Sequence, residues 1–159
     1  MTAQAFRITL PAASLALRLL QSRGLLAVRR KSRYVYYHPA PHPSIPFAES
    51  LLSVLQTVLA EPKGPDNAFF FLTAFTHPRR LDILRALGRG VRDSNDLRHI
   101  CKLSAPAFSR HKTKLLRRGI ITSPSPGSFQ IQTPDNLLAQ VLIRATLAID
   151  QDRLTAATD

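Results

Sequence analysis

A run of basic side chains without acidic neighbours is the feature of this sequence best suited to chemistry. No aspartate or glutamate lies between Asp96 and Asp135, while the interval holds seven cationic residues: Arg98, Lys102, Arg110, Lys112, Lys114, Arg117 and Arg118. Cations that no neighbouring acid neutralises are suited to binding phosphate, so the run predicts contact with a nucleic acid. The alternative is a solvated charged surface, which is what most charge runs are.

Helical periodicity separates the basic side chains of this run from the apolar ones. At about 100° per residue, a helix over residues 105–118 has one basic side, made of Ala107, Arg110, His111, Lys114 and Arg118. Its other side carries Phe108, Leu115 and the stem of Lys112. The pattern therefore predicts a helix that packs with one face and presents cations with the opposite face.

The start of this helix adds hydrogen-bonding groups to the basic side. Ser104 is the expected N-cap, with Pro106 in the first turn. The small Ala105 and Ala107 allow the backbone to approach a surface closely. The amides of the first turn, together with Ser104 and Ser109, are able to hydrogen-bond to phosphate.

A second basic cluster is predicted at the tip of a hairpin near the N-terminus. The expected arms are residues 25–28 and 33–37, and the tip is Arg29, Arg30, Lys31 and Ser32. Arg33 adds a fourth cation, and Tyr34, Tyr36 and Tyr37 follow it. The cluster predicts contact with a phosphate backbone or a minor groove. The alternative is a tip that only aids solubility.

Proline, glycine and capping residues divide the rest of the chain into predicted elements. Prolines between residues 39 and 46 and a Pro-Lys-Gly-Pro segment at residues 62–65 are expected connectors. The predicted helices span residues 11–23, 47–60, 68–75, 78–88, 94–101, 104–118 and 137–149, and two strands at 120–123 and 128–132 flank a Pro-Ser-Pro-Gly turn. Ser94 is the expected cap of the helix over 94–101, and Gly24 and Gly119 are expected to end two others.

The chain shows similarity to itself at a shift of 95 residues. Seven identities fall in the thirty ungapped positions from Leu10 to Pro39, whereas composition alone gives roughly two. The identical pairs are Pro11/Pro106, Ala12/Ala107, Ser14/Ser109, Leu20/Leu115, Arg23/Arg118, Gly24/Gly119 and Pro39/Pro134. They fall on caps, turns and core leucines, which favours a duplicated helix–hairpin unit.

The two copies differ in the side chains at matching positions of their helices. Leu15, Ala16 and Leu19 of the first copy stand where the second has Arg110, His111 and Lys114, so the first helix cannot read base edges by hydrogen bonding and is predicted to pack. The second copy starts near Asp66, and the same shift places the start of the first about thirty residues before Met1. We therefore expect a partial first unit, truncated or completed by a partner.

The second half resembles a known family. The blocks Thr76-His77-Pro78-Arg79-Arg80-Leu81-Asp82-Ile83-Leu84 and Leu103-Ser104-Ala105-Pro106-Ala107-Phe108-Ser109-Arg110-His111, followed by Leu115–Ile121, resemble ArsR-like winged helix-turn-helix regulators over about residues 68–147. The resemblance implies that the predicted helix over 104–118, the fourth of the second half, enters the major groove and that the hairpin after it acts as the wing. It also implies a homodimer formed through the first and last helices of this half. It implies that six positions face DNA: Ala105, Ala107, Ser109, Arg110, His111 and Lys114. Two departures are Lys112, where the family buries leucine, and an uncharged wing at residues 121–129.

Other classes of function lack the residues they require. Cys101 is the single cysteine, and the predicted helix over 137–149 has no histidine, so we expect neither a metal nor a cofactor. For His99 and Cys101, solvated and core positions are the expected ones. No nucleotide-binding glycine loop, carboxylate pair or activated nucleophile is present, so we expect no enzyme.

The overall charge and hydropathy complete the expectations. The 159 residues hold 22 lysines and arginines against 10 acids, which predicts an anionic partner, with an acidic membrane surface as second choice after nucleic acid. The longest near-continuous apolar stretch, residues 68–75, is about a third of a spanning helix, so we expect no membrane segment and a cytoplasmic protein. Part of its aromatic set, Phe69, Phe70, Phe71 and Phe75, is expected at an interface.

The sequence thus predicts a mainly α protein with small β-hairpins, organised as a winged helix-turn-helix. The expected units are a partial one at 1–61, a complete one at 66–150 and a tail at 151–159. The expected function is transcriptional regulation through duplex DNA, in which Arg110 reads bases beside Lys114 and His111. The expected phosphate ligands are Ser109, Arg117, Arg118, Arg29, Arg30, Lys31 and Arg33. A protein-interaction module that uses the apolar first helix, or a general RNA binder, remains the alternative.

Overall fold

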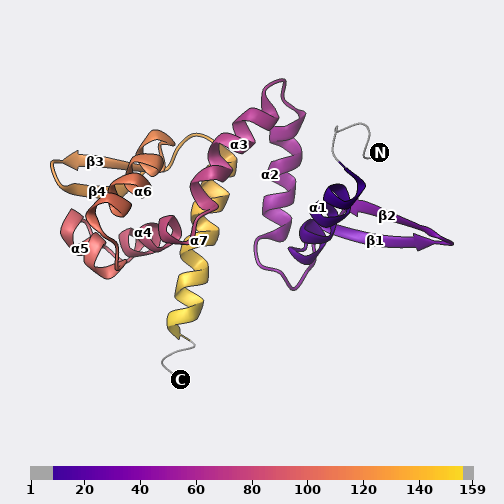
Figure 1. Ribbon diagram of the computed structural model, residues 1–159, viewed down its shortest axis with the longest axis horizontal. Helices are drawn as coiled ribbons and strands as arrows, with labels where there is room; N and C mark the ends of the chain where they lie inside the picture. Colours follow the sequence, from indigo (N-terminus) through magenta and orange to yellow (C-terminus); the bar gives the residue numbers. More distant parts are fainter. Residues whose placement is uncertain (1–8, 156–159) are drawn as a thin grey trace. The chain divides into compact units, whose positions relative to one another are not determined.

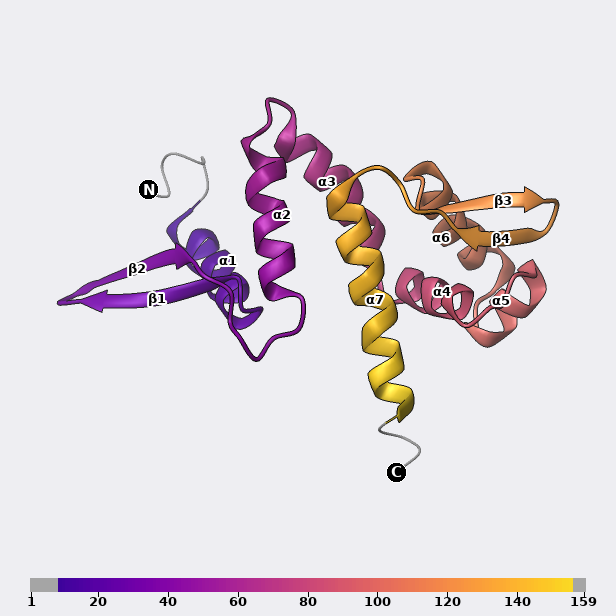
Figure 2. The same cartoon turned by 180° about the vertical axis from the view of Figure 1, so that it is seen from behind.

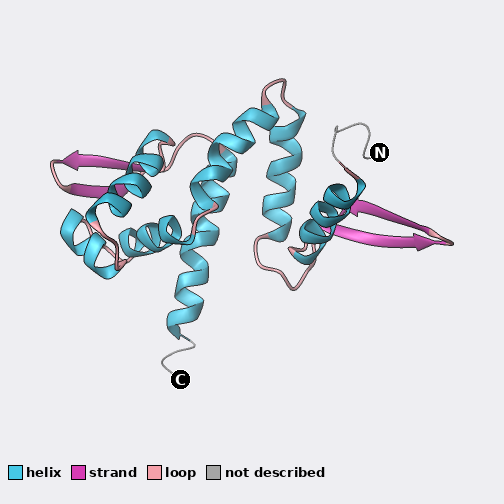
Figure 3. Cartoon of the chain, in the orientation of Figure 1, coloured by secondary structure: helices cyan, strands magenta, loops and turns pink. Residues whose placement is uncertain are grey.

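The computed structural model describes residues 9–155, and for residues 151–155 it describes the backbone alone (Figure 1). Within that range the chain is mainly helical, with seven helices and two small antiparallel β-hairpins (Figure 3). It divides into two compact units, Met1–Val54 and Leu55–Asp159. The division falls inside a helix, whereas the sequence predicted it in the connector at residues 62–65.

The first unit contains a helix, a hairpin and the start of a second helix. Helix α1 (Leu10–Ser22) leads into strands β1 (Leu26–Lys31) and β2 (Tyr34–Pro39), and α2 spans Ala48–Ala60. The hairpin is longer than the sequence predicted. Arg29, Arg30 and Lys31 lie within β1, and the turn consists of Ser32 and Arg33, with Ser32 at a φ of 54°. The expected basic tip is therefore a basic strand.

The second unit contains the remaining five helices and the second hairpin. Their bounds are α3 Gly64–Phe75, α4 Pro78–Gly88, α5 Ser94–Ile100, α6 Ala105–Arg117, β3 Ile121–Ser125, β4 Ser128–Ile131 and α7 Leu137–Thr155. Figures 1 and 2 both show α7 running beside α3 and α4.

Three elements of the second unit differ from the predicted ones. Gly64 and Pro65 belong to the first turn of α3, because proline is tolerated there, and not to a connector. The cap of α5 is Asp93, not Ser94, and its carboxylate accepts from the amides of Asn95 at 2.7 Å and Asp96 at 3.1 Å. Helix α7 continues to Thr155, beyond its predicted end.

The core of the second unit gathers apolar side chains from α4, α5, α6, the second hairpin and α7. The largest fully buried side chains are Ile83, Leu84, Leu87, Leu97, Leu115, Ile120, Ile121 and Leu138. Cys101 is buried in the same core, as predicted, and burial raises the pKa of its thiol to about 11. At neutral pH this thiol is protonated and unsuited to ligating a metal.

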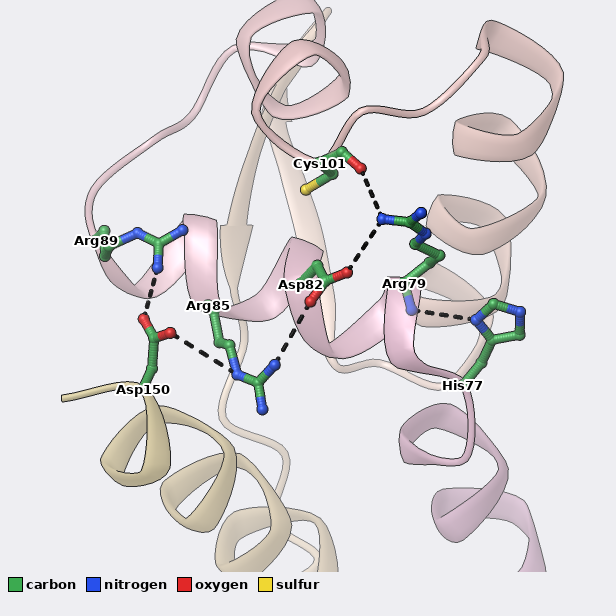
Figure 4. A network of polar contacts seen from close by, with 7 residues as sticks. All are labelled: His77, Arg79, Asp82, Arg85, Arg89, Cys101 and Asp150. Atoms are coloured by element: carbon green, nitrogen blue, oxygen red, sulfur yellow. Dashed lines mark hydrogen bonds and ion pairs between the residues drawn. The ribbon is translucent and has the colours of Figure 1, made fainter. Parts of the chain in front are cut away.

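A polar network along α4 ties the surrounding elements together (Figure 4). The Arg79 guanidinium donates to the Cys101 carbonyl at 3.3 Å, at the end of α5, and lies 3.6 Å from the Asp82 carboxylate. At the other end of α4, Arg89 and the Asp150 carboxylate of α7 are 2.7 Å apart. Helix α4 therefore holds both the segment that leads into α6 and the last helix.

The sequence repeat is also a repeat of secondary structure. Helices α1 and α6 begin and end at positions 95 residues apart. Their N-caps, Thr9 and Ser104, each accept a hydrogen bond from the amide three residues on, at 3.4 Å. At their ends, Gly24 and Gly119 both have positive φ, 71° and 65°. The repeat is less exact in the hairpins, since β1–β2 is longer than β3–β4.

Candidate nucleic-acid interface

Helix α6 is anchored by its inner face. Ser104 caps its start, and Phe108 and Leu115 point into the core, with exposed fractions of 4% and 0%. The other buried side chains of that core come from α3, α4, α5, the second hairpin and α7. The outer face of α6 is thereby fixed toward solvent, as the periodicity of the sequence predicted.

Lys112 belongs to the packed side of α6 despite its charge. Its ammonium lies 5.8 Å from the centroid of the Phe108 ring and 5.1 Å from that of Phe129 in β4. A long aliphatic stem with a cation over aromatic faces fills a place where a leucine would pack. Lys112 is therefore part of the contact between α6 and the second hairpin and not part of the outer face.

The outer face of α6 forms a shallow hollow lined by cationic and hydroxyl side chains. Its lining residues are Pro106, Ser109, Arg110, Thr113, Lys114 and Arg117. Arg110 and Arg117 are exposed, and Lys114 is half-buried. The ion pairs of the described residues lie within α4 or join Arg85 and Arg89 to Asp150 of α7, and none reaches this face. The cations of the hollow are thus left without an acidic partner there.

The charges around Lys114 repel one another. Partial burial lowers the pKa of Lys114, and the neighbouring charges of Arg118, Arg80 and Arg117 lower it further. A pKa lowered in this way means that the positive charge is less favourable here than in free solution. An anion placed in the hollow would relieve this repulsion.

His111 lies at the edge of the hollow against α4. Its ring centroid is 4.3 Å from that of His77, the N-cap of α4. Burial lowers the pKa of His111, and the charges of His77 and Arg80 lower it further. At neutral pH the ring is therefore neutral and able to take part in hydrogen bonds, but it does not add a charge to the face.

Arg118 has a partner that the sequence did not indicate. Its guanidinium carbon lies 3.9 Å from the centroid of the Phe70 ring, and its Nε donates to the Thr73 hydroxyl at 3.3 Å. Both partners belong to α3. The side chain predicted to hold phosphate is thus engaged in fastening the end of α6 to α3.

Arg80 is a residue near the site that the sequence reasoning missed. Its guanidinium donates to the carbonyls of Ala74 and Thr73, both at 2.7 Å, and so satisfies the end of α3. Burial lowers its pKa. The only sequence signal is the pair of arginines that follows His77-Pro78, and nothing local reveals which carbonyls the second one reaches.

The small residues at the start of α6 leave room for a partner surface to approach the helix backbone closely. Ala105 is exposed and Ala107 is half-buried. The Ser104 hydroxyl accepts the amide of Ala107 at 3.4 Å, which occupies it as a cap. Ser109 remains exposed on the outer face beside Arg110.

The other predicted cluster lies in the first unit. The four basic side chains Arg29, Arg30, Lys31 and Arg33 are all exposed. Arg33 folds back at the turn, where its Nη2 donates to the Tyr34 hydroxyl at 3.1 Å. This cluster is therefore accessible to an anionic partner.

The described residues contain neither a metal-binding cluster nor a helix able to span a membrane. Residues 9–150, whose side chains the structure describes, contain no cluster of three or more histidine, cysteine or acidic side chains able to hold a metal ion. Among the same residues no helix has the length and apolarity needed to cross a bilayer. Comparison of the chain with protein-family models, with curated proteins and with solved structures finds no match.

Proposed function

We propose that this chain is a DNA-binding transcriptional regulator of the winged-helix type, which reads duplex DNA with α6. In this proposal α5 and α6 form the helix-turn-helix, and the hairpin β3–β4 is the wing. One observation supports it above the others. The outer face of α6 presents Arg110, Lys114 and Arg117 without an acidic partner among the described residues, while the inner face is anchored in the core.

The dimensions and chemistry of α6 suit the major groove. Its 13 residues make a rod about 20 Å long. Arg110 is the proposed base reader, because a guanidinium bonds to guanine with two parallel hydrogen bonds. Lys114 and His111 lie beside it, and Ser109 and Arg117 contact phosphates. Ala105 and Ala107 let the start of the helix approach the backbone of the duplex.

The wing of this protein carries no charged residue, so other cations must add phosphate contacts. We assign them to the basic strand of the first unit, with Arg29, Arg30, Lys31 and Arg33 as ligands. These side chains are exposed and have no acidic partner among the described residues. Together with α6 they would neutralise about six phosphates, which corresponds to a log–log salt slope near −5.

The proposal includes a homodimer, which the resemblance to ArsR-like regulators implies. Such dimers pair through the first and last helices of the unit, here α3 and α7. Phe69 of α3 is 69% exposed, and Leu137 and Ile149 of α7 are exposed as well. An apolar side chain as open as Phe69 is suited to burial in an interface.

Selection of bound fragments from a random duplex pool, repeated at two salt concentrations, tests the proposal. We expect a shared motif to emerge, and binding to weaken steeply as salt rises. The Arg110→Ala variant should lose about tenfold in affinity for the selected site and should discriminate less at one base pair. The change removes the hydrogen bonds to a base edge.

Arg23→Ala is a charge-matched control, because Arg23, the C-cap residue of α1, is an exposed arginine like Arg110. It removes the same charge, and no contact is assigned to it. Equal losses in the two variants, or binding of every duplex with one affinity, would contradict sequence reading by α6.

Protein docking through α1 is the second candidate function. It is favoured by the exposure of the α1 leucines, since Leu15 is 60% exposed and Leu19 is 53% exposed. A stable complex with another protein that is lost in Leu15→Asp, together with no shift of any duplex, would favour this function over DNA binding.

A further inference from the structure

The two faces of the hairpin β1–β2 differ in chemistry. In the antiparallel register, Arg29 is paired with Tyr36 and Lys31 with Tyr34. Residues directly opposite each other across two strands share a face, and alternate residues along a strand lie on opposite faces. Arg29, Lys31, Tyr34 and Tyr36 therefore share one face, which we call the tyrosine face.

Near its turn the hairpin is exposed on both faces, and the tyrosine face carries two exposed aromatic side chains there. Tyr34 and Tyr36 are 53% and 52% exposed, and Arg29 and Lys31 are exposed too. On the opposite face Arg30 and Val35 near the turn are also exposed, whereas Leu26, Val28 and Tyr37, farther from the turn, are half-buried. Large aromatic side chains that remain about half exposed near the turn of a hairpin contribute little to its packing.

The segment of the chain that carries the tyrosine face contains no acidic residue. Residues 1–48 include no aspartate or glutamate, whereas they include seven lysines and arginines. The first acid, Glu49, lies in α2. The positive potential of this face is therefore not offset by any acidic residue of the segment that precedes α2.

The two rings are arranged side by side and not stacked on each other. Their centroids are 6.4 Å apart, with the ring planes at 54°, and the Arg33 guanidinium lies 5.3 Å from the Tyr34 centroid. Both side chains are about half exposed, so a planar group could stack against them. Aromatic platforms flanked by cations bind unpaired bases, whereas bases within a duplex already stack on one another.

We propose that the tyrosine face binds single-stranded nucleic acid. Two neighbouring bases stack on Tyr34 and Tyr36, while Arg29 and Lys31 contact the phosphates between and beside them. This site goes beyond the proposed reading of duplex DNA by α6, since it takes unpaired bases on Tyr34 and Tyr36. It shares Arg29 and Lys31 with the proposed phosphate contacts of the basic strand.

The three tyrosines of the chain provide a reporter confined to this hairpin. The sequence contains no tryptophan, and its tyrosines are Tyr34, Tyr36 and Tyr37. Titration of the full chain with oligothymidylate of about eight nucleotides should quench its intrinsic fluorescence, after correction for absorbance by the oligonucleotide. Oligouridylate of the same length distinguishes an RNA ligand from a DNA ligand, and a blunt duplex of that length shows whether unpaired bases are required.

Paired variants on the two faces make the test specific. Tyr36→Leu should lower the affinity for oligothymidylate about tenfold, whereas Tyr36→Phe, which keeps the ring, should retain it. Arg29→Ala should lose more affinity than Arg30→Ala, although both remove one charge from the same strand. The salt slope should fall by about 0.7 in Arg29→Ala.

Three results would overturn the proposal. One is equal affinity of Tyr36→Leu and Tyr36→Phe, with both folded by far-UV circular dichroism. A second is an equal loss in Arg29→Ala and Arg30→Ala, which would indicate a charge effect without a preferred face. The third is quenching of the tyrosine fluorescence by the blunt duplex at concentrations as low as those of oligothymidylate, which would show that the hairpin binds duplex phosphates without a preference for unpaired bases. Failure of α6 to read duplexes affects none of these measurements, because α6 contains no tyrosine.

Discussion

The two helix–hairpin repeats of this chain share a backbone pattern and distribute their charges in opposite ways. In the second repeat, α6 carries the cations and the hairpin β3–β4 has no charged residue. In the first repeat, α1 has a single cation, Arg18, and the hairpin β1–β2 has the basic strand. The comparison teaches that caps and glycines preserve the local fold while the surface chemistry of each element changes independently.

Burial differs between the repeats as much as charge does. Leu115 of α6 is fully buried, whereas its counterpart in α1, Leu20, is 42% exposed. The inner face of α6 meets α4 and the second hairpin, and no residue of α1 is buried. The same helix thus stabilises the fold in one repeat and presents leucines to solvent in the other.

Truncation of these two leucines should have the largest effect of any change considered. Leu115→Ala removes buried methyl groups and leaves a cavity, so we expect the free energy of unfolding to fall by about 2–5 kcal/mol. Leu20→Ala should cost less than about 1 kcal/mol, because much of that side chain already contacts water. Urea unfolding followed by far-UV circular dichroism measures both. Equal losses would show that α1 is covered in solution.

The glycines at the ends of the two helices provide a smaller contrast. Alanine at a positive φ costs about 1–2 kcal/mol, so both Gly24→Ala and Gly119→Ala should destabilise. An added Cβ at Gly24 would lie 2.7 Å from the Ile45 side chain, whereas at Gly119 it would meet no atom within 4 Å. Gly24→Ala should therefore lose about 1 kcal/mol more. A larger loss at Gly119 would contradict the packing of Ile45 against the end of α1.

The ends of α1 and α6 could be predicted from the sequence because their signals are local. Thr9, Ser104, Gly24 and Gly119 act within one turn of the helix that they cap or end. The extent of the first hairpin could not be predicted in this way. Its basic strand is extended because Arg29, Arg30 and Lys31 pair across with residues 34–36, and such pairing depends on a partner strand.

The candidate site shows the same division between local and distant causes. The outward position of Arg110 and Lys114 followed from helical periodicity and the apolar residues between them. The engagement of Arg118 with Phe70 and Thr73 did not, because those partners lie in a helix far away in the sequence. Periodicity predicts which way a side chain points, whereas its partner depends on the tertiary fold.

A charge removed from α6 should be visible in the salt dependence of duplex binding, with Lys114 as the test. Lys114→Ala should reduce the magnitude of the log–log slope by about 0.9, because one fewer phosphate is neutralised. Leu19→Ala, at the matching position of α1, removes no charge and should leave the slope as it is. Anisotropy titrations of one labelled duplex at several salt concentrations measure this. An unchanged slope in Lys114→Ala would remove Lys114 from the interface.

The smallest expected effect concerns His111, whose counterpart in α1 is Ala16. Burial first, and then the charges of four neighbours, lower the pKa of His111 in the folded chain; these neighbours are His77, Arg80, Arg110 and Arg79. Between the lowered pKa and about 6.5, the unfolded chain therefore binds more protons at this site than the folded chain does. The free energy of unfolding should decrease as the pH falls through this window, and the stability should be fully present above it.

His111→Gln should weaken that decrease, because glutamine does not titrate. Loss of the ring contact with His77 lowers the stability at every pH. The comparison therefore uses the slope of the free energy of unfolding against pH and not its absolute value. Ala16→His places a histidine at the matching, exposed position of α1, where burial does not oppose its charge, and should leave the slope as in the original chain. Unfolding in urea at several pH values from about 7.5 to 5.5 measures all three proteins. Identical slopes for the original chain and His111→Gln would show that the cations around α6 do not oppose protonation of this ring.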